Sequence, residues 1–408
     1  WQVVTEPAFQ GLLNQTQGYY QVFVRNRFGW LDRRGELAIA PAWYEATPFD
    51  SLGLSFVLGK SGYAWLDTNG HTYLTEKQLP PNTRLSGRGS NGAAVLALLP
   101  DTSAADTTWD DPLDRDPWVL YKQSCYPEWF GVADSLDSYN PEDTLYQVLD
   151  MEGGLCSPDT FRNVRVWREG LLAAESDTGW GFLGWAGGWR ILPTLRAVAT
   201  DFHEGLAAVT PPSLYNLYVY INPDGQQAFP GQFTRAKAFQ HGYAPVRKVH
   251  KWGLINRGGE VTIPFQFREV AAPDDSGYVI VVDENGKYGL WQTLRGEIVA
   301  PQYQFIAPFS NGLARVKVPQ GWGFINRKGK MVVKPDYADA LDFSDGLACV
   351  KAYGQWGYVN TEGEEVIVPQ FERYADFYDG YALIIEKKGY RFSSYYIDKT
   401  GERVWPNR

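Results

Sequence analysis

A segment of about 34 residues, centred on the pattern Trp-Gly-aromatic-Ile-Asn/Asp, repeats along this chain. The stretch GLARVKVPQGWGFINRKG begins at Gly312, and its counterpart GLACVKAYGQWGYVNTEG begins at Gly346. A fixed period of this length is typical of repeat proteins, in which each unit packs on its neighbours. The sequence therefore predicts a tandem array, rather than the two or three separate domains that 408 residues would otherwise suggest.

Ten units can be aligned on a Trp-like anchor and on a turn glycine that follows seven or eight residues later. The anchors are Phe28, Tyr63, Tyr146, Trp180, Tyr218, Trp252, Tyr288, Trp322, Trp356 and Ser394. The glycines are Gly35, Gly70, Gly153, Gly187, Gly225, Gly259, Gly296, Gly329, Gly363 and Gly401. Neighbouring anchors are 34 to 38 residues apart, except for 83 residues between Tyr63 and Tyr146.

Each unit is predicted to form three antiparallel strands, exemplified by Leu313 to Val318, Trp322 to Asn326 and Met331 to Lys334. The first of these alternates apolar and polar residues, as a half-buried strand does. Pro335 is expected to end the pairing because it has no amide hydrogen to donate. The connector from Tyr337 to Phe343 leads to the next unit, and the sequence leaves open whether it adds a fourth short strand.

The repeated Trp is interpreted as a core residue, because every unit needs the same apolar contact with its neighbour. Stacking on a ligand is the alternative. The glycine that follows it, as in Gly253, Gly323 and Gly357, lies inside a predicted strand. A glycine there indicates a β-bulge, or a close approach by a neighbouring ring or backbone.

The fold class that follows is all-β. We expect about ten three-stranded units in an open, curved, solenoid-like stack, with each unit burying its Trp and Ile or Val against the next. A closed toroid or β-propeller is the alternative. Propeller blades usually have four strands and about 40 to 45 residues, so a unit of 34 residues favours the open form.

The long gap between anchors is explained by an insertion in the third unit. Asn91 to Leu98 match the first strand of a unit, and Leu145 to Gly153 match its second strand and turn. Residues 99–144 are therefore predicted to be an insertion at a hairpin tip, within a single array over residues 1–408. Such insertions often make the binding contacts of repeat proteins.

The insertion is rich in acidic and aromatic residues, with eleven acids against Arg115 and Lys122. Its aromatic residues are candidates for contacts with a protein partner or a glycan: Trp109, Trp118, Tyr121, Tyr126, Trp129 and Phe130. A calcium site is a second interpretation, through Asp106, Asp110, Asp111, Asp114 and Asp116, although their spacing is not that of an EF-hand loop. A third interpretation is a solvated loop whose aromatic rings fold back on the array.

The three cysteines have no metal-binding spacing. Cys125 in the insertion and Cys156 in the same unit could form a disulfide, for which their Cα atoms must lie within about 7 Å. Cys349 follows an apolar strand pattern and is expected to be an unbridged small residue.

Charge and composition exclude several classes of function. The net charge of -9 argues against a nucleic-acid partner, which would require a basic stripe. No stretch approaches the roughly 18 apolar residues of a membrane-spanning helix. The chain starts at Trp1 rather than Met, which indicates a processed product, a trimmed product or a fragment. Any signal peptide or lipid anchor would then already have been removed, and a lipid anchor or a larger complex is left open.

The sequence contains no recognisable catalytic motif, neither a G-x-S-x-G elbow nor a phosphate-binding P-loop. His71, His203, His241 and His250 occupy different places in different units, and none has a partner at metal-ligand spacing. They are expected to be surface turn residues. We therefore expect no enzymatic activity and no cofactor, with calcium as the one alternative.

The stretches KWGLIN at Lys251 to Asn256, GWGFIN at Gly321 to Asn326 and QWGYVN at Gln355 to Asn360 resemble the WG-repeat family of bacterial proteins. The resemblance is strong from about residue 236 to 390. It implies no common catalytic activity, and it implies a bacterial envelope or secreted context. The expected function is a non-enzymatic scaffold for a protein partner that is periplasmic, cell-surface or secreted, with the cytoplasm left open. The alternative is a glycan- or small-ligand-binding repeat protein.

Overall fold

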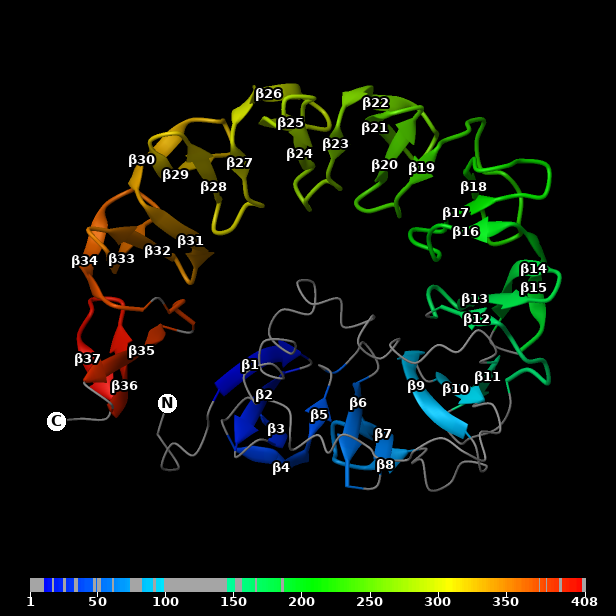
Figure 1. The fold of residues 1–408 in the computed structure, drawn as a ribbon, viewed down its shortest axis with the longest axis horizontal. Coiled ribbons are helices and arrows are strands. Elements are labelled where there is room, and N and C mark those ends of the chain that lie inside the picture. Colours follow the sequence, from blue (N-terminus) through cyan, green and yellow to red (C-terminus); the bar gives the residue numbers. More distant parts are fainter. Residues whose placement is uncertain are drawn as a thin grey trace. The chain divides into compact units, whose positions relative to one another are not determined.

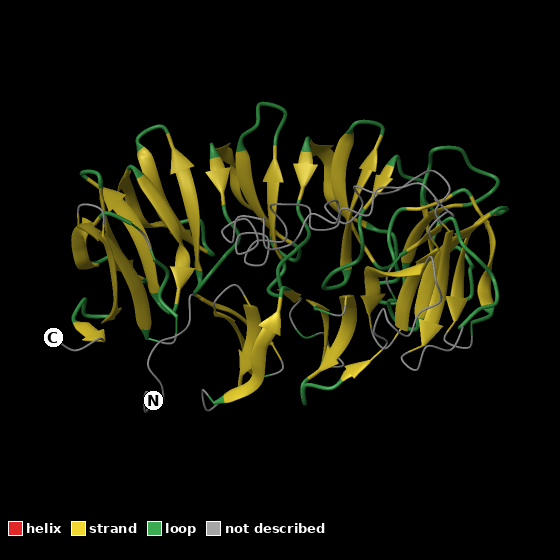
Figure 2. Ribbon diagram, turned by 60° about the horizontal axis from the view of Figure 1, so that its bottom comes forward, coloured by secondary structure: helices red, strands yellow, loops and turns green. Residues whose placement is uncertain are grey.

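The computed structural model is all-β, and Figure 2 shows strands and loops with no helix among the residues that it describes. No described helix could therefore cross a membrane. The residues described are 11–16, 18–24, 27–32, 36–46, 49, 53–60, 62–73, 83–90, 93–98, 145–150, 156–165, 167–184, 187–373, 375–378, 380–388 and 391–405.

The chain divides into two compact units, and Figure 1 labels their strands along the ribbon. Unit 1 consists of Trp1–Tyr215 and Ile221–Gln226, and unit 2 of Asn216–Tyr220 and Gln227–Arg408. The boundary falls within β18 (Val219–Ile221), which belongs to the sheet β16-β17-β18 with β16 (Ala197–Val198) and β17 (Ala207–Thr210).

Unit 1 contains four further antiparallel sheets. They are β1-β2-β3-β4 (Gly11–Thr16, Tyr19–Val24, Arg27–Leu31, Leu37–Trp43), β5-β6-β7-β8 (Glu45–Ala46, Leu54–Gly59, Gly62–Asp67, Thr72–Tyr73), β11-β10-β9 (Leu145–Asp150, Ala93–Leu98, Thr83–Ser90) and β12-β13-β14-β15 (Asn163–Val164, Leu171–Ser176, Gly179–Gly184, Trp189–Leu195).

Unit 2 contains five antiparallel sheets among its described residues. They are β19-β20-β21-β22 (Arg235–Ala236, Tyr243–Lys248, Lys251–Asn256, Val261–Phe267), β23-β24-β25-β26 (Glu269–Val270, Tyr278–Val282, Tyr288–Gln292, Gly296–Tyr303), β27-β28-β29-β30 (Phe305–Ile306, Leu313–Val318, Gly321–Asn326, Met331–Tyr337), β31-β32-β33-β34 (Asp339–Ser344, Leu347–Ala352, Gln355–Asn360, Glu365–Phe371) and β35-β36-β37 (Tyr381–Lys388, Arg391–Asp398, Arg403–Trp405).

The expectation of three strands per unit is wrong for seven of the ten sheets in the described part of the chain, which have four. The additional strand comes from the connector, and is only two residues long in cases such as Phe305–Ile306. So short a strand has no periodicity that a sequence could display. The strand count therefore no longer favours an open stack over a propeller.

The last strand of the sheet, which we call the fourth strand and which is β30 in this example, continues past its proline. Trp322 pairs with Tyr337 and Phe324 with Val333, so the stretch around Pro335 forms a bulge and pairing then resumes. The expectation that Pro335 ends the pairing is wrong. Proline can occupy this position because a residue in a bulge is unpaired, so no neighbouring strand needs the amide hydrogen that proline lacks.

The glycine after the Trp faces this bulge. A Cβ atom on Gly323 would lie 2.6 Å from the carbonyl oxygen of Val333 and 2.9 Å from the nitrogen of Pro335. Equivalent contacts occur at Gly29, Gly181, Gly253, Gly289 and Gly357. The predicted bulge with a close backbone approach is therefore confirmed, and the approaching backbone is that of the fourth strand.

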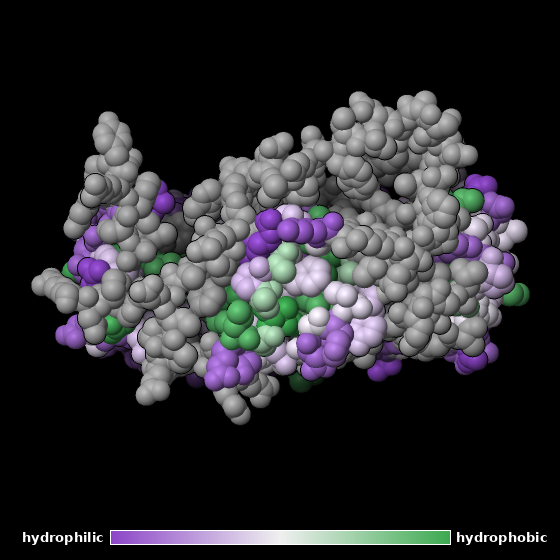
Figure 3. All heavy atoms as spheres, turned by 90° about the horizontal axis from the view of Figure 1, so that it is seen from below, coloured by the Kyte–Doolittle hydropathy of each residue, from purple (hydrophilic) through white to green (hydrophobic). Residues whose placement is uncertain are grey.

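The fourth strand lies at the edge of its sheet and carries exposed apolar side chains. Leu37 is 55% exposed, Val261 50% and Val368 59%. Figure 3 shows hydrophobic side chains, in green, beside hydrophilic ones, in purple, on the described part of one face. Proline-containing bulges disfavour pairing with another chain along such edges. We interpret the repeated proline as a feature that prevents this edge strand from pairing with an edge strand of another molecule.

Neighbouring sheets pack face to face, and the central contact is made by the residue two positions after the Trp. Phe324 is 0% exposed and packs with Val350 and Val359 of the next sheet. An aromatic ring from the next connector meets it edge-on: Phe182 with Phe202 (centroids 4.9 Å apart), Tyr220 with Phe239 (4.9 Å), Phe324 with Phe343 (4.8 Å) and Tyr358 with Phe377 (4.9 Å).

The expectation that the Trp itself is the main core residue needs correction. Trp356 is buried, whereas Trp252 and Trp322 are only half-buried. The Trp stands at the start of its strand, while the residue two positions later stands over the middle of the neighbouring sheet. The Ile and Val positions are buried as expected, with Ile325 and Val359 both at 0% exposure.

The recurring Asn or Asp at the end of the pattern forms the next turn. Asn326 Oδ1 accepts hydrogen bonds from the backbone amides of Lys328 (3.0 Å) and Lys330 (3.1 Å). Gly329 within this turn has a φ of 75°, which glycine adopts without strain. The same pair of bonds is made by Asp67, Asn222, Asn256, Asn360 and Asp398. These side chains therefore serve the fold.

A second set of turns, just before the first long strand, links consecutive sheets. Asn311 Oδ1 accepts a hydrogen bond from the amide of Gly346 (2.6 Å), and Asp345 Oδ2 accepts one from Gly380 (2.5 Å). The ammonium group of Lys399 lies 2.8 Å from Asp345 Oδ1. The hydrogen bond from Lys399 is the main reason that the pKa of Asp345 is lowered, and the Gly380 amide adds to it.

Asp345→Asn should therefore lower stability at neutral pH and have little effect in acid. A carboxylate whose pKa is lowered in the folded state contributes stability above its unfolded pKa, and that contribution is lost as the pH falls through the folded pKa. Because the ion pair is partly exposed, we expect a loss of about 0.5 kcal/mol at pH 7. Asparagine can keep the bond from Gly380, as Asn311 does from Gly346.

Denaturant unfolding at pH 7 and pH 3 measures this difference. An equal loss at both pH values would show that the charge of Asp345 is not the cause.

Candidate functional site

The residues predicted to form the functional surface lie outside the described residues. They are the aromatic residues Trp109, Trp118, Tyr121, Tyr126, Trp129 and Phe130, the acids Asp106, Asp110, Asp111, Asp114 and Asp116, and Cys125. Their roles, including calcium binding and the disulfide between Cys125 and Cys156, stay predictions. Cys349 is described and is 1% exposed in the core, where burial raises the pKa of its thiol to about 12.

The structure does describe the two strands that flank the insertion. β10 and β11 are antiparallel neighbours, with Ala93 opposite Asp150 and Leu98 opposite Leu145. Residues 99–144 therefore join two adjacent strands. In several other units the corresponding link is a two-residue hairpin tip, such as Pro319 and Gln320 between β28 and β29, and it is longer between β17 and β18 and between β24 and β25.

The Trp rings of the pattern in unit 2, both the half-buried ones and the buried Trp356, are contacted by cations. The pairs are Lys237 and Trp252 (5.1 Å from nitrogen to ring centroid), Lys317 and Trp322 (4.7 Å) and Lys351 and Trp356 (5.4 Å). The guanidinium of Arg315 also lies 4.8 Å from the Trp322 centroid. A cation at this distance is attracted to the ring. It also occupies the face on which a sugar would stack, so we place no glycan site on these rings.

A charge cluster links two neighbouring sheets of unit 2. Arg315 on β28 pairs with Asp342 of the next connector, with Nε and Oδ1 3.1 Å apart. Desolvation raises the pKa of Asp342 and of Asp376, and the charge of Asp342 raises the latter further, while Arg315 opposes both shifts. A similar pair, Arg165 and Asp201 at 2.8 Å, occurs in unit 1. We interpret both pairs as contacts between sheets.

The histidines are separated from one another and lie in or beside turns, as expected. His241 Nδ1 is 3.1 Å from the carbonyl oxygen of Pro273, and His71 Nδ1 is 3.4 Å from Asp67. Within the described ranges, no group of three or more His, Cys, Asp or Glu side chains could hold a metal ion.

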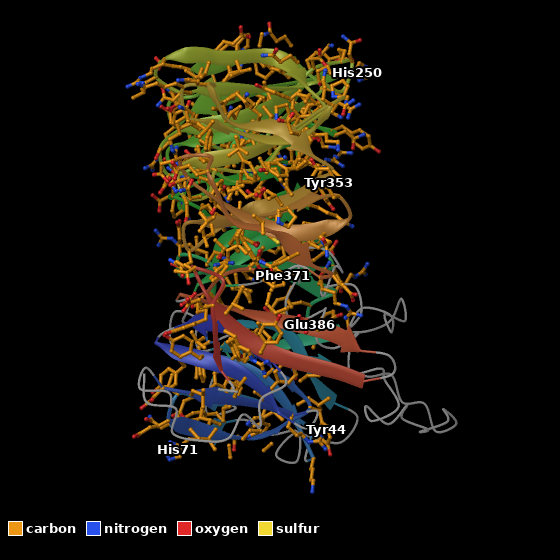
Figure 4. All side chains as sticks on the ribbon, turned by 90° about the vertical axis from the view of Figure 1, so that its left-hand side faces the viewer. Tyr44, His71, His250, Tyr353, Phe371 and Glu386 are labelled. Atoms are coloured by element: carbon orange, nitrogen blue, oxygen red, sulfur yellow. The ribbon has the colours of Figure 1, made fainter. Side chains whose placement is uncertain are left out.

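The hairpin tips between the first and second long strands of unit 2 form the most unusual described surface. Val249 has a φ of 55° and is 68% exposed, and Tyr353 has a φ of 52° and is 101% exposed. A positive φ is costly for a β-branched residue such as valine. Figure 4 shows His250, beside Val249, and Tyr353 on the same side of the structure. We call the tips 249–250, 319–320 and 353–354 the tip edge.

Basic residues surround the Val249 tip. Arg235 is directly opposite Arg247 across two strands, and Lys248 is directly opposite Lys251. Lys251 forms an ion pair with Glu284. None of the ion pairs found among the described residues involves Arg235, Arg247 or Lys248. Like charges directly opposite each other destabilise a sheet, so the fold alone does not explain this arrangement.

Sequence reasoning missed the tip edge. The run Arg-Lys-Val-His-Lys at 247–251 was a visible signal, since it gathers four basic residues in a chain of net charge -9. Its significance depends on strand register, because only the register shows which cations face each other.

The comparison with protein families now decides what kind of repeat this is. The model described as "WG containing repeat" matches residues 220–248, 252–288, 293–318, 322–355 and 356–390. These five matches between residues 220 and 390 cover less than half of the chain and begin 32, 41, 29 and 34 residues apart. The resemblance to this family is confirmed over the matched residues.

Other comparisons say less. No curated protein matches the chain in sequence. Among solved structures, a eukaryotic initiation factor matches with 9% identity over 99% of this chain and 89% of its own, at a TM-score of 0.38. BamB from Moraxella catarrhalis matches with 12% identity over 57% and 77%, at 0.28. PorZ, a surface component of the type-IX secretion system of Porphyromonas gingivalis, matches with 9% identity over 95% and 60%, at 0.27. Scores this low carry no argument about function.

Proposed function

We propose that this WG-repeat protein is a non-enzymatic scaffold for a protein partner in a bacterial cell envelope or secreted assembly. The observation that carries the proposal is that the recurring residues are used by the fold. The aromatic residue of the pattern is buried between sheets, its glycine admits the bulge, and its Asn or Asp makes the turn. Binding is then left to segments that differ between units.

The insertion at 99–144 is the largest such segment. It takes the place of a two-residue tip between adjacent strands, so it can vary without disturbing the strand register. The six candidate aromatic residues and the eleven acids of this insertion suit contacts with a protein surface. We propose that it captures the partner.

Replacing residues 99–144 with a two-residue turn should abolish partner capture while the array stays folded. The measurement is affinity purification of the native full-length protein, followed by mass spectrometry, compared between wild type and variant. A matched variant keeps the insertion and replaces its five candidate calcium ligands, Asp106, Asp110, Asp111, Asp114 and Asp116, with Asn. Capture that survives the replacement of the whole segment would contradict the proposal. Capture that is lost in the Asn variant, and also in the wild type after calcium is removed, would favour an ion site.

We also propose that the array is open. The unit length of 34 residues, shorter than a usual blade of about 40 to 45 residues, is what favours this form. The radius of gyration from solution scattering measures it, and a value as small as that of a compact globule would contradict it.

A further inference from the structure

The tip of the β20–β21 hairpin combines unpaired positive charge with an exposed apolar residue. Arg235 and Lys248 are exposed, and no described carboxylate forms an ion pair with either of them. The two like-charge cross-strand pairs, Arg235 with Arg247 and Lys248 with Lys251, impose a cost on the folded protein. An anionic partner would remove that cost.

The apolar part of the tip is held outward by specific contacts. The hydroxyl oxygen of Thr234 lies 3.1 Å from the carbonyl oxygens of both Val249 and Arg247, so its single proton is shared between these two acceptors. Lys248 is exposed, and its ammonium group lies over the rings of Phe265 and Phe233, 5.0 Å and 5.7 Å from their centroids. An asparagine or glycine would adopt the positive φ of Val249 with less strain.

A second apolar residue stands at the equivalent tip three sheets further along. Tyr353 is fully exposed, and Gly354 beside it also has a positive φ, as a tight hairpin requires. Lys351 lies on the strand that leads to this tip. Tyrosine is enriched where proteins meet the interface between membrane and water. The tip edge thus presents apolar residues with cations behind them at two places on one side of unit 2 (Figure 4).

We propose that the tip edge of unit 2 docks on an anionic lipid surface. Val249 and Tyr353 enter the headgroup region, and Arg235, Arg247, Lys248 and Lys251 contact the lipid phosphates. The tips project from the strand ends, and a projecting tip fits a flat surface better than it fits an extended peptide, which needs a groove or a free strand edge.

The negative charge of the whole chain does not prevent this docking. Exposed charges further away than about 10 Å are largely screened at 0.1 M salt, so the membrane senses mainly the local cations. Glu284 neutralises Lys251 in part, which leaves Arg235, Arg247 and Lys248 as the principal contacts. This inference is independent of the proposed role of residues 99–144.

The test is co-sedimentation of the full chain with vesicles of phosphatidylcholine alone, or with 30 mol% phosphatidylglycerol, at 0.1 M salt. We expect binding only to the anionic vesicles. The double variant Arg235→Gln/Lys248→Gln should bind roughly 30-fold more weakly, because each basic residue near such a surface contributes about 1 kcal/mol. The variant should be at least as heat-stable as wild type, because it removes both like-charge pairs.

Lys328→Gln/Lys330→Gln is the matched control. It changes the net charge equally, at turns on the opposite ends of the strands, and should bind as wild type does. Val249→Asn should relieve backbone strain and still weaken binding roughly fivefold, through the lost apolar contact.

Three results would overturn the proposal: no binding to anionic vesicles, equal losses in the tip variant and the Lys328/Lys330 control, or unchanged binding by Val249→Asn. Binding to soluble polyglutamate without binding to vesicles would assign the tip to an acidic protein segment instead.

Discussion

Phe324→Ala should lower the free energy of unfolding by about 3 to 5 kcal/mol, one of the largest effects expected from a single side chain in unit 2. The ring is 0% exposed, and it packs with Val350 and Val359 of the next sheet and against Phe343. Removing it leaves a cavity between two sheets that their hydrogen-bonded strands prevent from closing. Denaturant unfolding followed by circular dichroism measures the change.

Trp322→Leu is the comparison that makes this prediction specific to the structure. Trp322 is larger than Phe324 and more conspicuous in the sequence, but it is half-buried and its ring is covered by Lys317 and Arg315. We expect the Leu variant to lose about 1 to 2 kcal/mol, since part of the apolar contact remains. A larger loss from Trp322→Leu than from Phe324→Ala would show that the Trp is the principal core residue after all.

Gly357→Ala should cost about 3 kcal/mol, although it adds a single methyl group. A Cβ atom at this position would lie 2.5 Å from the carbonyl oxygen of Ile367 and 2.6 Å from the nitrogen of Pro369. Both atoms belong to backbone, so no side-chain rotation can relieve the clash. β34 must therefore move, and this movement disturbs its bulge and the pairing of Trp356 with Phe371. Thermal unfolding and denaturant midpoints both report the loss.

Gly258→Ala is the matched control for this substitution. Its Cβ would meet only the side-chain oxygen of Asn256 at 3.4 Å, and Lys328 and Glu362 occupy the equivalent turn position in other units. We expect a change within about 0.5 kcal/mol. Similar losses at Gly258 and Gly357 would indicate that a general effect of glycine replacement, rather than the bulge contact, is responsible.

Much of the architecture could be predicted from the period and from local turn chemistry. The first strand of the best-defined unit was predicted at Leu313 to Val318, the bounds that β28 has. The Trp-Gly strand agrees to within one residue, as β29 starts at Gly321. Alternation of side chains and the demand of tight turns for Asn and Gly are properties of neighbouring residues, so sequence displays them directly.

Other features depend on which residues meet across space. Trp322 and Phe324 lie on the same face of their strand, and only packing against the next sheet decides that Phe324 is the more deeply buried. The connector strand β27 (Phe305–Ile306) is too short to have a sequence pattern. The register of β30 past Pro335 depends on a bulge opposite Gly323. The glycine in the sequence indicated a bulge, but the sequence did not show which strand approaches that glycine.

The sequence by itself thus determined the repeat, the all-β class and the family that residues 220–390 resemble, because each of these depends on local spacing. Only the tertiary structure decided the four-stranded sheets, the aromatic residue that fills the core and the facing cations of the tip edge. Arg235 and Arg247 are twelve positions apart in the sequence, and their opposition exists only because two strands are held in register by backbone hydrogen bonds.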